Sequence, residues 1–280
     1  MTDKPPSPAR IPLHPGSCPR IAIFVATVWE LAAVRAALPH GRTETCAGKP
    51  LYVAEVGRGE CWVLQTGVGP QKAGASARAL FRRQAFSMSL STGFACALTA
   101  AEIGDVLMGT AVAMIDSANA GLPDYCEVPG AERDRFYAAI GEFRQGSRCR
   151  EGRFVSVDRI VGRASDKGAL AQRTGAVGLD MESAALACEA GVAQVPFVIV
   201  RTVSDLLEEE LPLDFNLFLR PTGWLRGIGA VLAHPVESLS GLLRLRRQSA
   251  LAARNLTRLL GGAFEAFFAE RPDSHTRAVR

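Results

Sequence analysis

Two carboxylates in this chain follow apolar runs, where they could do acid–base chemistry together. The apolar run 195–203 ends in Ser204-Asp205, and a carboxylate at the end of a buried strand needs a partner. Glu182 follows a shorter apolar run, 176–179. Open α/β sheets bind ligands at the carboxyl ends of their strands, so we expect both acids on one rim of the sheet. Two carboxylates placed there could grip a sugar and protonate a leaving group.

Each acid also has a simpler explanation. Glu30 lies four residues past Ala26, and taken alone it is a solvated charge on a helix face. It gains interest because the other acids share its rim. Asp180 could cap the amino end of a helix, where Asp is favoured. Glu182 would suit the dipole of the same helix, so position alone leaves its functional and structural roles both open.

Two glycine segments follow predicted strands. Gly67, Gly69 and Gly74 open a predicted helix, but they do not form GxGxxG, and no acid lies about 20 residues on to hold a ribose. This favours a tight turn that brings backbone amides near a ligand over a dinucleotide site. Gly93 allows either a close approach of the backbone to a substrate or an ordinary strand-to-helix turn.

The elements that must position these residues alternate between strand and helix. The predicted strands are 21–26, 51–56, 60–65, 87–92, 105–115, 153–160, 176–179 and 196–203. The predicted helices are 29–38, 71–83, 165–173 and 181–190, and 117–150 is expected to be polar and rich in loops. This order favours an α/β fold with three αβα layers and a central, twisted, mainly parallel mixed sheet, followed by a C-terminal helical extension.

Composition and charge divide the chain further. It has 280 residues, 48% hydrophobic and 21% charged, which is enough for a substantial core. The net charge of +4 is too small to argue for a nucleic-acid partner. Residues 221–280 hold 9 Arg and 4 acids, a net +5, so residues 1–220 sum to −1. We expect a flexible Pro-rich lead-in (1–20), a catalytic domain (21–220), a basic helical extension (221–270) and a disordered tail (271–280).

The lead-in holds six prolines and no apolar segment typical of a signal peptide. No run of about 18 apolar residues would span a bilayer. The seven cysteines are odd in number and form no CxxC pair, which predicts reduced, buried thiols and a cytoplasmic location. The four scattered histidines argue against a His-based catalytic device, and we expect neither a metal nor a cofactor.

Several of these segments together resemble the nucleoside phosphorylase/hydrolase family, especially its methylthioadenosine/S-adenosylhomocysteine nucleosidases. The matching segments run in family order over about residues 20–215. They are 21–24 through Glu30, 66–69, 91–95 with 103–105, Asp180-Met181-Glu182-Ser183-Ala184, and 195–197 through Ser204-Asp205.

The resemblance implies a role for each acid. Asp205 should protonate the purine as the base leaves, assisted by Ser204, and Glu30 should activate the attacking water. Glu182 should hold the ribose hydroxyls, with Met181 packed beside the sugar. A general acid on the leaving group and a base on the water are the pair that cleavage through an oxocarbenium-like sugar requires.

The substrate pocket implied by the resemblance contains departures from the family. Gly93 and Phe94 should lie against the substrate, and Ile160 and Val161 fall where the base pocket lies. The family's usual Ser-Ala-Gly-Gly reads Phe-Ala-Cys-Ala at 94–97, and Val25 replaces a glycine of the first strand. The arginines that clamp phosphate in the family's phosphorylases are missing, which favours hydrolysis over phosphorolysis.

The C-terminal run is similar to the tail of hopanoid-associated phosphorylases, a subfamily thought to release adenine from adenosylhopane. This similarity implies a 5′-substituted, lipid-linked adenosine as substrate and peripheral contact with the inner membrane face. In 242–268, leucines and phenylalanines recur at roughly helical spacing among arginines, as in a helix lying on a membrane. The alternative is an ordinary helix packed on the domain or on a partner subunit.

Two other functions remain open: a phosphate-dependent purine nucleoside phosphorylase, and a nucleoside-binding protein without catalysis. The family resemblance further implies a homo-oligomer, a dimer or larger.

Overall fold

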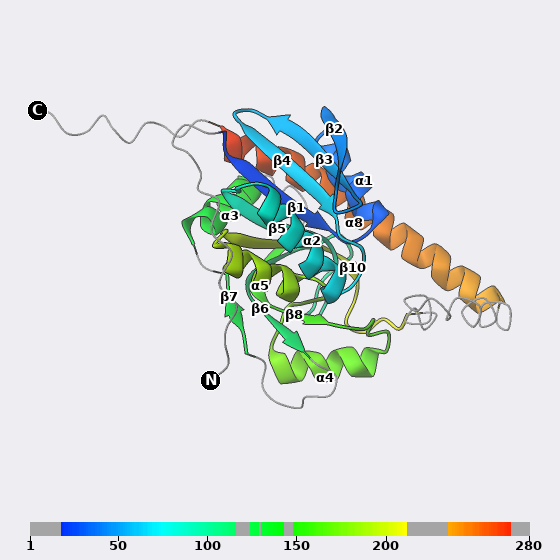
Figure 1. The fold of residues 1–280 in the computed structure, drawn as a ribbon. Coiled ribbons are helices and arrows are strands. Elements are labelled where there is room, and N and C mark those ends of the chain that lie inside the picture. Colours follow the sequence, from blue (N-terminus) through cyan, green and yellow to red (C-terminus); the bar gives the residue numbers. More distant parts are fainter. Residues whose placement is uncertain (1–17, 116–123, 129, 143–147, 212–234, 270–280) are drawn as a thin grey trace, which may run out of the picture.

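The computed structural model describes residues 18–115, 124–128, 130–142, 148–211 and 235–269 (Figure 1). Most of the predicted lead-in, the start of the helical extension and the tail at 271–280 therefore lie outside the described residues. The strands are β1 Arg20–Val25, β2 Gly41–Cys46, β3 Lys49–Val56, β4 Gly59–Gln65, β5 Met88–Ala97, β6 Val106–Ile115, β7 Cys126–Glu127, β8 Cys149–Val157, β9 Gly178–Asp180 and β10 Phe197–Asp205. The helices are α1 Val28–Ala37, α2 Pro70–Arg83, α3 Ala131–Glu142, α4 Ala164–Thr174, α5 Ser183–Ala193 and α8 Pro235–Phe268.

One mixed sheet carries the fold, in the order β10-β6-β8-β9-β5-β1-β4-β3-β2. Parallel pairing joins β1 to β4 and β5, β5 to β10, and β8 to β6 and β9. Because β10 pairs with both β6 and β5, the strands β5, β9, β8, β6 and β10 close into a ring, from which β1 to β4 extend. The predicted mixed α/β architecture is confirmed, and the closure brings β5 and β10 side by side.

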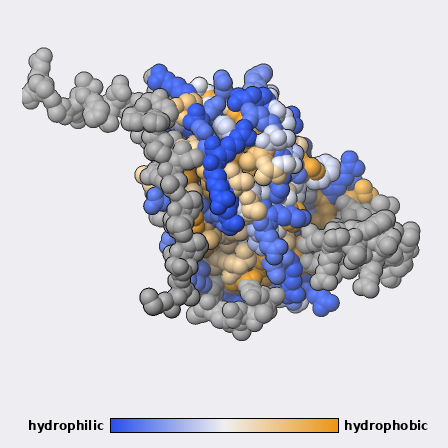
Figure 2. Space-filling model, viewed as in Figure 1, coloured by the Kyte–Doolittle hydropathy of each residue, from blue (hydrophilic) through white to orange (hydrophobic). Residues whose placement is uncertain are grey.

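Helices cover both faces of the sheet, which gives the expected three layers (Figure 1). On one face α2 and α5 bury apolar side chains, including Ala77, Phe81 and Leu186. On the other face α1, α3 and α8 form a second core, to which Val34 and Phe264 belong. Short Ala and Gly side chains let α2 and α5 pack closely against one another. Figure 2 shows that the outer surface on the α2 and α5 side is mixed, with an apolar area between hydrophilic side chains, and Val192 of α5 is 44% exposed.

The C-terminal helix α8 has a packed half and an exposed half. Leu256, Leu260, Phe264 and Phe267 are buried in the core shared with α1 and α3. The part before residue 252 extends beyond the sheet in Figure 1, and its Leu243 is 48% exposed. The alternative of an ordinary helix packed on the domain therefore describes the second half. None of the described helices combines the length and the apolar character needed to cross a membrane.

Some boundaries differ from those predicted. The strand expected at 87–92 continues as β5 to Ala97, so Gly93 lies inside a strand and not at a strand-to-helix turn. The polar edge strand β2 was not expected, and the segment taken as loop contains β7 and α3. All seven cysteines are free thiols, but Cys18, Cys126 and Cys188 are exposed, so the expectation of burial holds only for some of them.

Candidate active site

A buried arginine lies at the centre of the site. Arg201 is in β10 and only 1% exposed. Its Nη2 atom lies 3.0 Å from Oδ2 of Asp180 and 3.8 Å from Oε2 of Glu182, and its Nη1 atom lies 3.8 Å from Oε1 of Glu30. Three carboxylates thus surround one guanidinium group, which leaves the cluster with excess negative charge. We call these four residues the Arg201 cluster.

Glu30 enters this cluster because of the way α1 begins. Thr27 caps the helix and forms a capping box with Glu30, the third helical residue. The Glu30 Oε2 atom accepts hydrogen bonds from the backbone N–H groups of Ala26 (2.9 Å) and Thr27 (2.7 Å). Its Oε1 atom accepts from the N–H of Phe94 in β5 at 2.8 Å. Glu30 is 3% exposed, so it is a buried acceptor of hydrogen bonds and not a solvated charge on a helix face.

The amino end of α5 positions two more carboxylates. Glu182 is the N-cap residue of α5, and its Oε1 atom accepts a hydrogen bond from the N–H of Gly69 at 2.9 Å. Asp180 accepts from the N–H groups of Glu182 and Ser183, each at 3.2 Å, so it helps to cap the helix while it also pairs with Arg201. Burial raises the pKa of Glu182 to about 7, and Arg201 opposes this while Asp180 and Glu30 add to it.

The glycine loop before α2 presents an amide to this acid. Gly67 and Gly69 have φ values of +79° and +101°, a region that favours glycine. The turn aims the Gly69 N–H at Glu182, as the previous contact shows. The expected approach of backbone amides to a site is therefore seen, with a carboxylate of the protein as the acceptor.

Asp205 occupies the end of β10, as expected, and has a separate partner. The Nζ atom of Lys167, in α4, lies 2.9 Å from Oδ1 and 2.8 Å from Oδ2 of Asp205. Burial raises the pKa of Asp205, and Lys167 opposes this rise. Asp205 follows Arg201 by four residues, which is about 13 Å along an extended strand. Asp205 and the Arg201 cluster are thus held at two places along β10.

The remaining predicted residues lie around these two centres. Phe94 is half-buried, and its carbonyl lies 3.4 Å from Nη1 of Arg201. Met181 is half-buried and packs against the small core of β8 and β9, while Ser204 is partly exposed beside Asp205. Val161, directly after Ile160, lines a groove of about 240 Å³.

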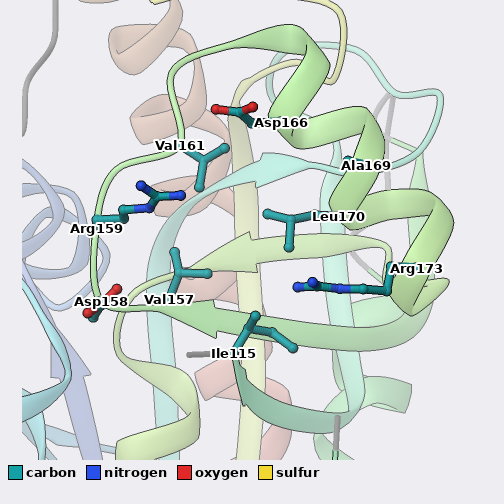
Figure 3. A pocket seen from close by; sticks show the side chains of 9 residues that line it. All are labelled: Ile115, Val157, Asp158, Arg159, Val161, Asp166, Ala169, Leu170 and Arg173. Atoms are coloured by element: carbon teal, nitrogen blue, oxygen red, sulfur yellow. The ribbon is translucent and has the colours of Figure 1, made fainter. Parts of the chain in front are cut away.

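This groove lies between the end of β8 and helix α4 (Figure 3). Leu170 and Arg173 of α4 point toward Val157 and Ile115 of the sheet, and Val161 closes one end. The predicted base-pocket segment is therefore held between the sheet and the helix that carries Lys167.

Sequence reasoning missed Arg201 and Lys167. Arg201 carried a usable signal, because a single charge inside the apolar strand 197–203 requires a buried partner. Lys167 had no such signal, since it lies in the polar sequence of α4 and its burial depends on how that helix packs.

The arrangement can do two things chemically. The Arg201 cluster offers buried carboxylates that can accept hydrogen bonds from hydroxyl groups and stabilise positive charge nearby. Asp205 can donate a proton to a leaving group at the other end of the rim.

Comparisons with known proteins show the family and the fold. The family described as the phosphorylase superfamily matches residues 20–220. A 5′-methylthioadenosine/S-adenosylhomocysteine nucleosidase of Bacillus thuringiensis (strain Al Hakam) is 27% identical over 211 residues, which cover 71% of this chain and 91% of the relative.

Two solved structures share the fold. The nucleosidase of the same name from Neisseria meningitidis, in complex with methylthio-immucillin-A, superposes with a TM-score of 0.68 at 20% identity, covering 88% of this chain and 98% of that one. The futalosine hydrolase of Helicobacter pylori superposes with a TM-score of 0.65 at 16% identity, covering 86% and 97%.

Proposed function

The chain belongs to the phosphorylase superfamily, and we propose that it is a nucleosidase that hydrolyses the bond between adenine and the ribose of a 5′-substituted adenosine. The observation that carries the proposal is that charged side chains gather at two separate places along β10. Arg201 gathers Glu30, Asp180 and Glu182 at one point of the rim, and Asp205 stands at the strand end. Cleavage of a nucleoside requires both hydrogen-bond acceptors for its sugar and an acid that protonates its base.

Each acid then has one task. Glu182 accepts hydrogen bonds from the ribose hydroxyls, and Asp205 donates a proton to the purine as the C–N bond breaks. Glu30 takes the proton of the water that adds to the sugar carbon. The sugar gains positive charge in the transition state, and the excess negative charge of the Arg201 cluster stabilises that charge.

Water is a better nucleophile for this site than phosphate. Phosphate carries negative charge and needs free cations, whereas the guanidinium of Arg201 is already committed to Asp180 and to the hydroxyl of Ser91, at 2.8 Å. A phosphate would also be repelled by the surplus carboxylate charge. The geometry therefore favours hydrolysis over phosphorolysis.

A role in binding alone does not account for Glu30. Its carboxylate is buried, aligned by three backbone N–H groups and placed beside Arg201. A protein that only binds a nucleoside does not need a base for water, so the placement of the Glu30 carboxylate favours a catalyst.

The finer proposal concerns the 5′ group. We infer a lipid-linked adenosine of the adenosylhopane type, reached at a membrane surface. The exposed half of α8 supports this, because Arg246 and Arg247 lie there beside the exposed Leu243. Basic and apolar side chains on an exposed helix are the features that suit an anionic lipid surface.

One assay tests both levels of the proposal. Adenine release is measured from adenosine, methylthioadenosine, S-adenosylhomocysteine and an adenosyl-lipid, each with and without phosphate. We expect free sugar as the second product, independent of phosphate, and the highest kcat/KM with the adenosyl-lipid. A sugar 1-phosphate formed only with phosphate would instead identify a phosphorylase. If adenine is released from none of the four substrates, the remaining function is that of a nucleoside-binding protein without catalysis.

A further inference from the structure

Lys167 is a buried cation with one carboxylate partner. Its side chain is 0% exposed, although it lies in the otherwise polar helix α4. Its Nζ atom contacts both oxygens of Asp205 and also donates to the carbonyls of Leu206 (3.0 Å) and Glu209 (2.7 Å). The two carbonyls belong to the turn directly after β10, so Lys167 fixes that turn and the Asp205 carboxylate together.

The other lysines of the described residues are placed differently. Lys49 is half-buried and donates to neutral oxygens, the carbonyl of Thr66 and the hydroxyl of Ser76. Lys72 is exposed. Burying an ammonium group is costly unless it is paired and hydrogen-bonded, so the placement of Lys167 needs a reason specific to Asp205.

We propose that Lys167 is the positioning residue of the leaving-group acid: it holds the Asp205 carboxyl group at the rim and stabilises the carboxylate that forms when Asp205 gives up its proton. This inference rests on the proposed function. In the reaction the O–H bond of Asp205 breaks, an N–H bond forms on the purine, and the electrons of the C–N bond pass to the base. Asp205 is left as an anion beside a cation, and solvent restores its proton for the next turnover.

Among the groups that face Asp205, Lys167 is the one that most favours the charged form of its carboxyl group. Cys96 of β5 lies opposite Asp205 in the strand register and is a neutral thiol, because burial raises its pKa. Glu209 is negative, but Gln248 and Arg244 of α8 hold its carboxylate. Lys167 alone among these supplies a positive charge in contact with the carboxylate. It counteracts burial, which by itself would make the acid too weak to release its proton.

The test is the pH dependence of kcat/KM for Lys167→Met. A general acid works only when protonated, so activity is lost as pH rises through the pKa of Asp205. Removing the cation raises that pKa, and the alkaline limb of the profile should therefore move to higher pH, while the maximal rate falls at least tenfold. Lys49→Met removes a half-buried lysine that donates to neutral oxygens, and it should leave the limb where it is in the wild type. A limb that stays in place in Lys167→Met would overturn the proposal.

A second comparison keeps the proposal testable if Lys167→Met folds poorly. Asp205→Asn/Lys167→Met removes both charges, so it avoids an unpaired buried ion. If Lys167 acts through Asp205, adding Lys167→Met to Asp205→Asn should change kcat/KM less than twofold. A further loss as large as in the wild-type background would show a role elsewhere and overturn the proposal. The proposed function fails separately, if Asp205→Asn alone releases adenine at the wild-type rate.

Discussion

Gly93 makes room for the Glu30 side chain, because a β-carbon on Gly93 would overlap the Glu30 carboxylate. Gly93 has a φ of +136° inside β5, which an L side chain rarely adopts. The missing side chain lets the acid lie against the strand and accept the N–H of Phe94. Gly93 therefore makes room for the Glu30 carboxylate, in addition to any approach to a substrate.

Gly93→Ala should displace Glu30. A misplacement of about 1 Å can cost on the order of 10²-fold in rate, and we expect a loss of at least this size. The unfavourable φ should also cost about 1–2 kcal/mol in stability. The measurements are adenine release and thermal unfolding. Gly191→Ala in α5 is the control, since its new methyl group meets open space, and it should leave both unchanged or slightly raise stability. A fully active Gly93→Ala would contradict this role.

Asp205→Asn should abolish general acid catalysis. The side chain keeps its shape but loses the titratable proton, and such catalysis is typically worth about 10²–10⁴-fold. We expect adenine release to fall by that factor in steady-state assays. Unchanged turnover in a folded Asp205→Asn protein would remove Asp205 from the mechanism.

The positions of the carboxylates could be predicted because apolar runs in the sequence mark where the strands end. Asp205 closes β10, and Glu182 follows β9, as the apolar runs indicated. The cation that pairs with Asp205 was less accessible. Lys167 becomes buried only through the packing of α4, which no local pattern encodes.

The elements that were missed have physical reasons. Strand β2 is an exposed, polar edge strand, and its pairing with β3 gives it regular structure without an apolar pattern. Helix α3 buries Phe136 and Ile140 on a single face, within a sequence that is otherwise charged. Gly93 was taken as a strand end because glycine is a common turn signal, whereas here it admits another side chain.

Glu182→Gln should separate activity from stability. The folded pKa of Glu182 is about 7, above the ordinary value of 4.5, so the folded protein binds the extra proton between these values. Wild-type stability therefore falls as pH rises through this window, and one pKa unit is worth about 1.4 kcal/mol. The Gln variant lacks this cost and should be more stable than the wild type by on the order of 2 kcal/mol at pH 8, with little difference near pH 4.

The same variant should lose most activity, and the wild type should act poorly on 2′-deoxy substrates, if Glu182 holds the ribose hydroxyls as we propose. Thermal unfolding at both pH values and adenine release are the measurements. Glu189→Gln, on the same helix in an ion pair with the half-exposed Arg78, is the control and should show neither effect. Equal rates on ribo and deoxyribo substrates would return Glu182 to a helix-capping role.

Arg201→Met should destabilise the protein strongly. It leaves three buried carboxylates without their cation, and breaking a buried pair costs about 3–5 kcal/mol. Loss of the guanidinium also raises the pKa of Glu182 further, since Arg201 holds it down. The deficit measured by urea unfolding should therefore be larger at pH 8 than at pH 5.5. A deficit independent of pH would mean that Arg201 stabilises the site by packing alone.

The exposed half of α8 can be tested without removing the helix. Truncation after residue 235 would delete Phe264 and Phe267 from the core, so it would unfold the domain whatever the first half does. Arg246 and Arg247 are exposed in the extended half, whereas Arg254 and Arg258 are exposed on the packed half. The two pairs allow the same change of charge at two places on one helix.

Each basic residue near an anionic bilayer contributes about 1 kcal/mol to binding. Arg246→Glu/Arg247→Glu should therefore weaken binding to anionic liposomes by at least about 30-fold in a flotation assay. Cleavage of methylthioadenosine should be unaffected, because both side chains are exposed, while cleavage of a liposome-borne adenosyl-lipid should fall. Arg254→Glu/Arg258→Glu should retain most of the binding. Equal losses in both variants would indicate unspecific attraction, and a wild-type protein that never floats with anionic liposomes would make α8 a purely structural helix.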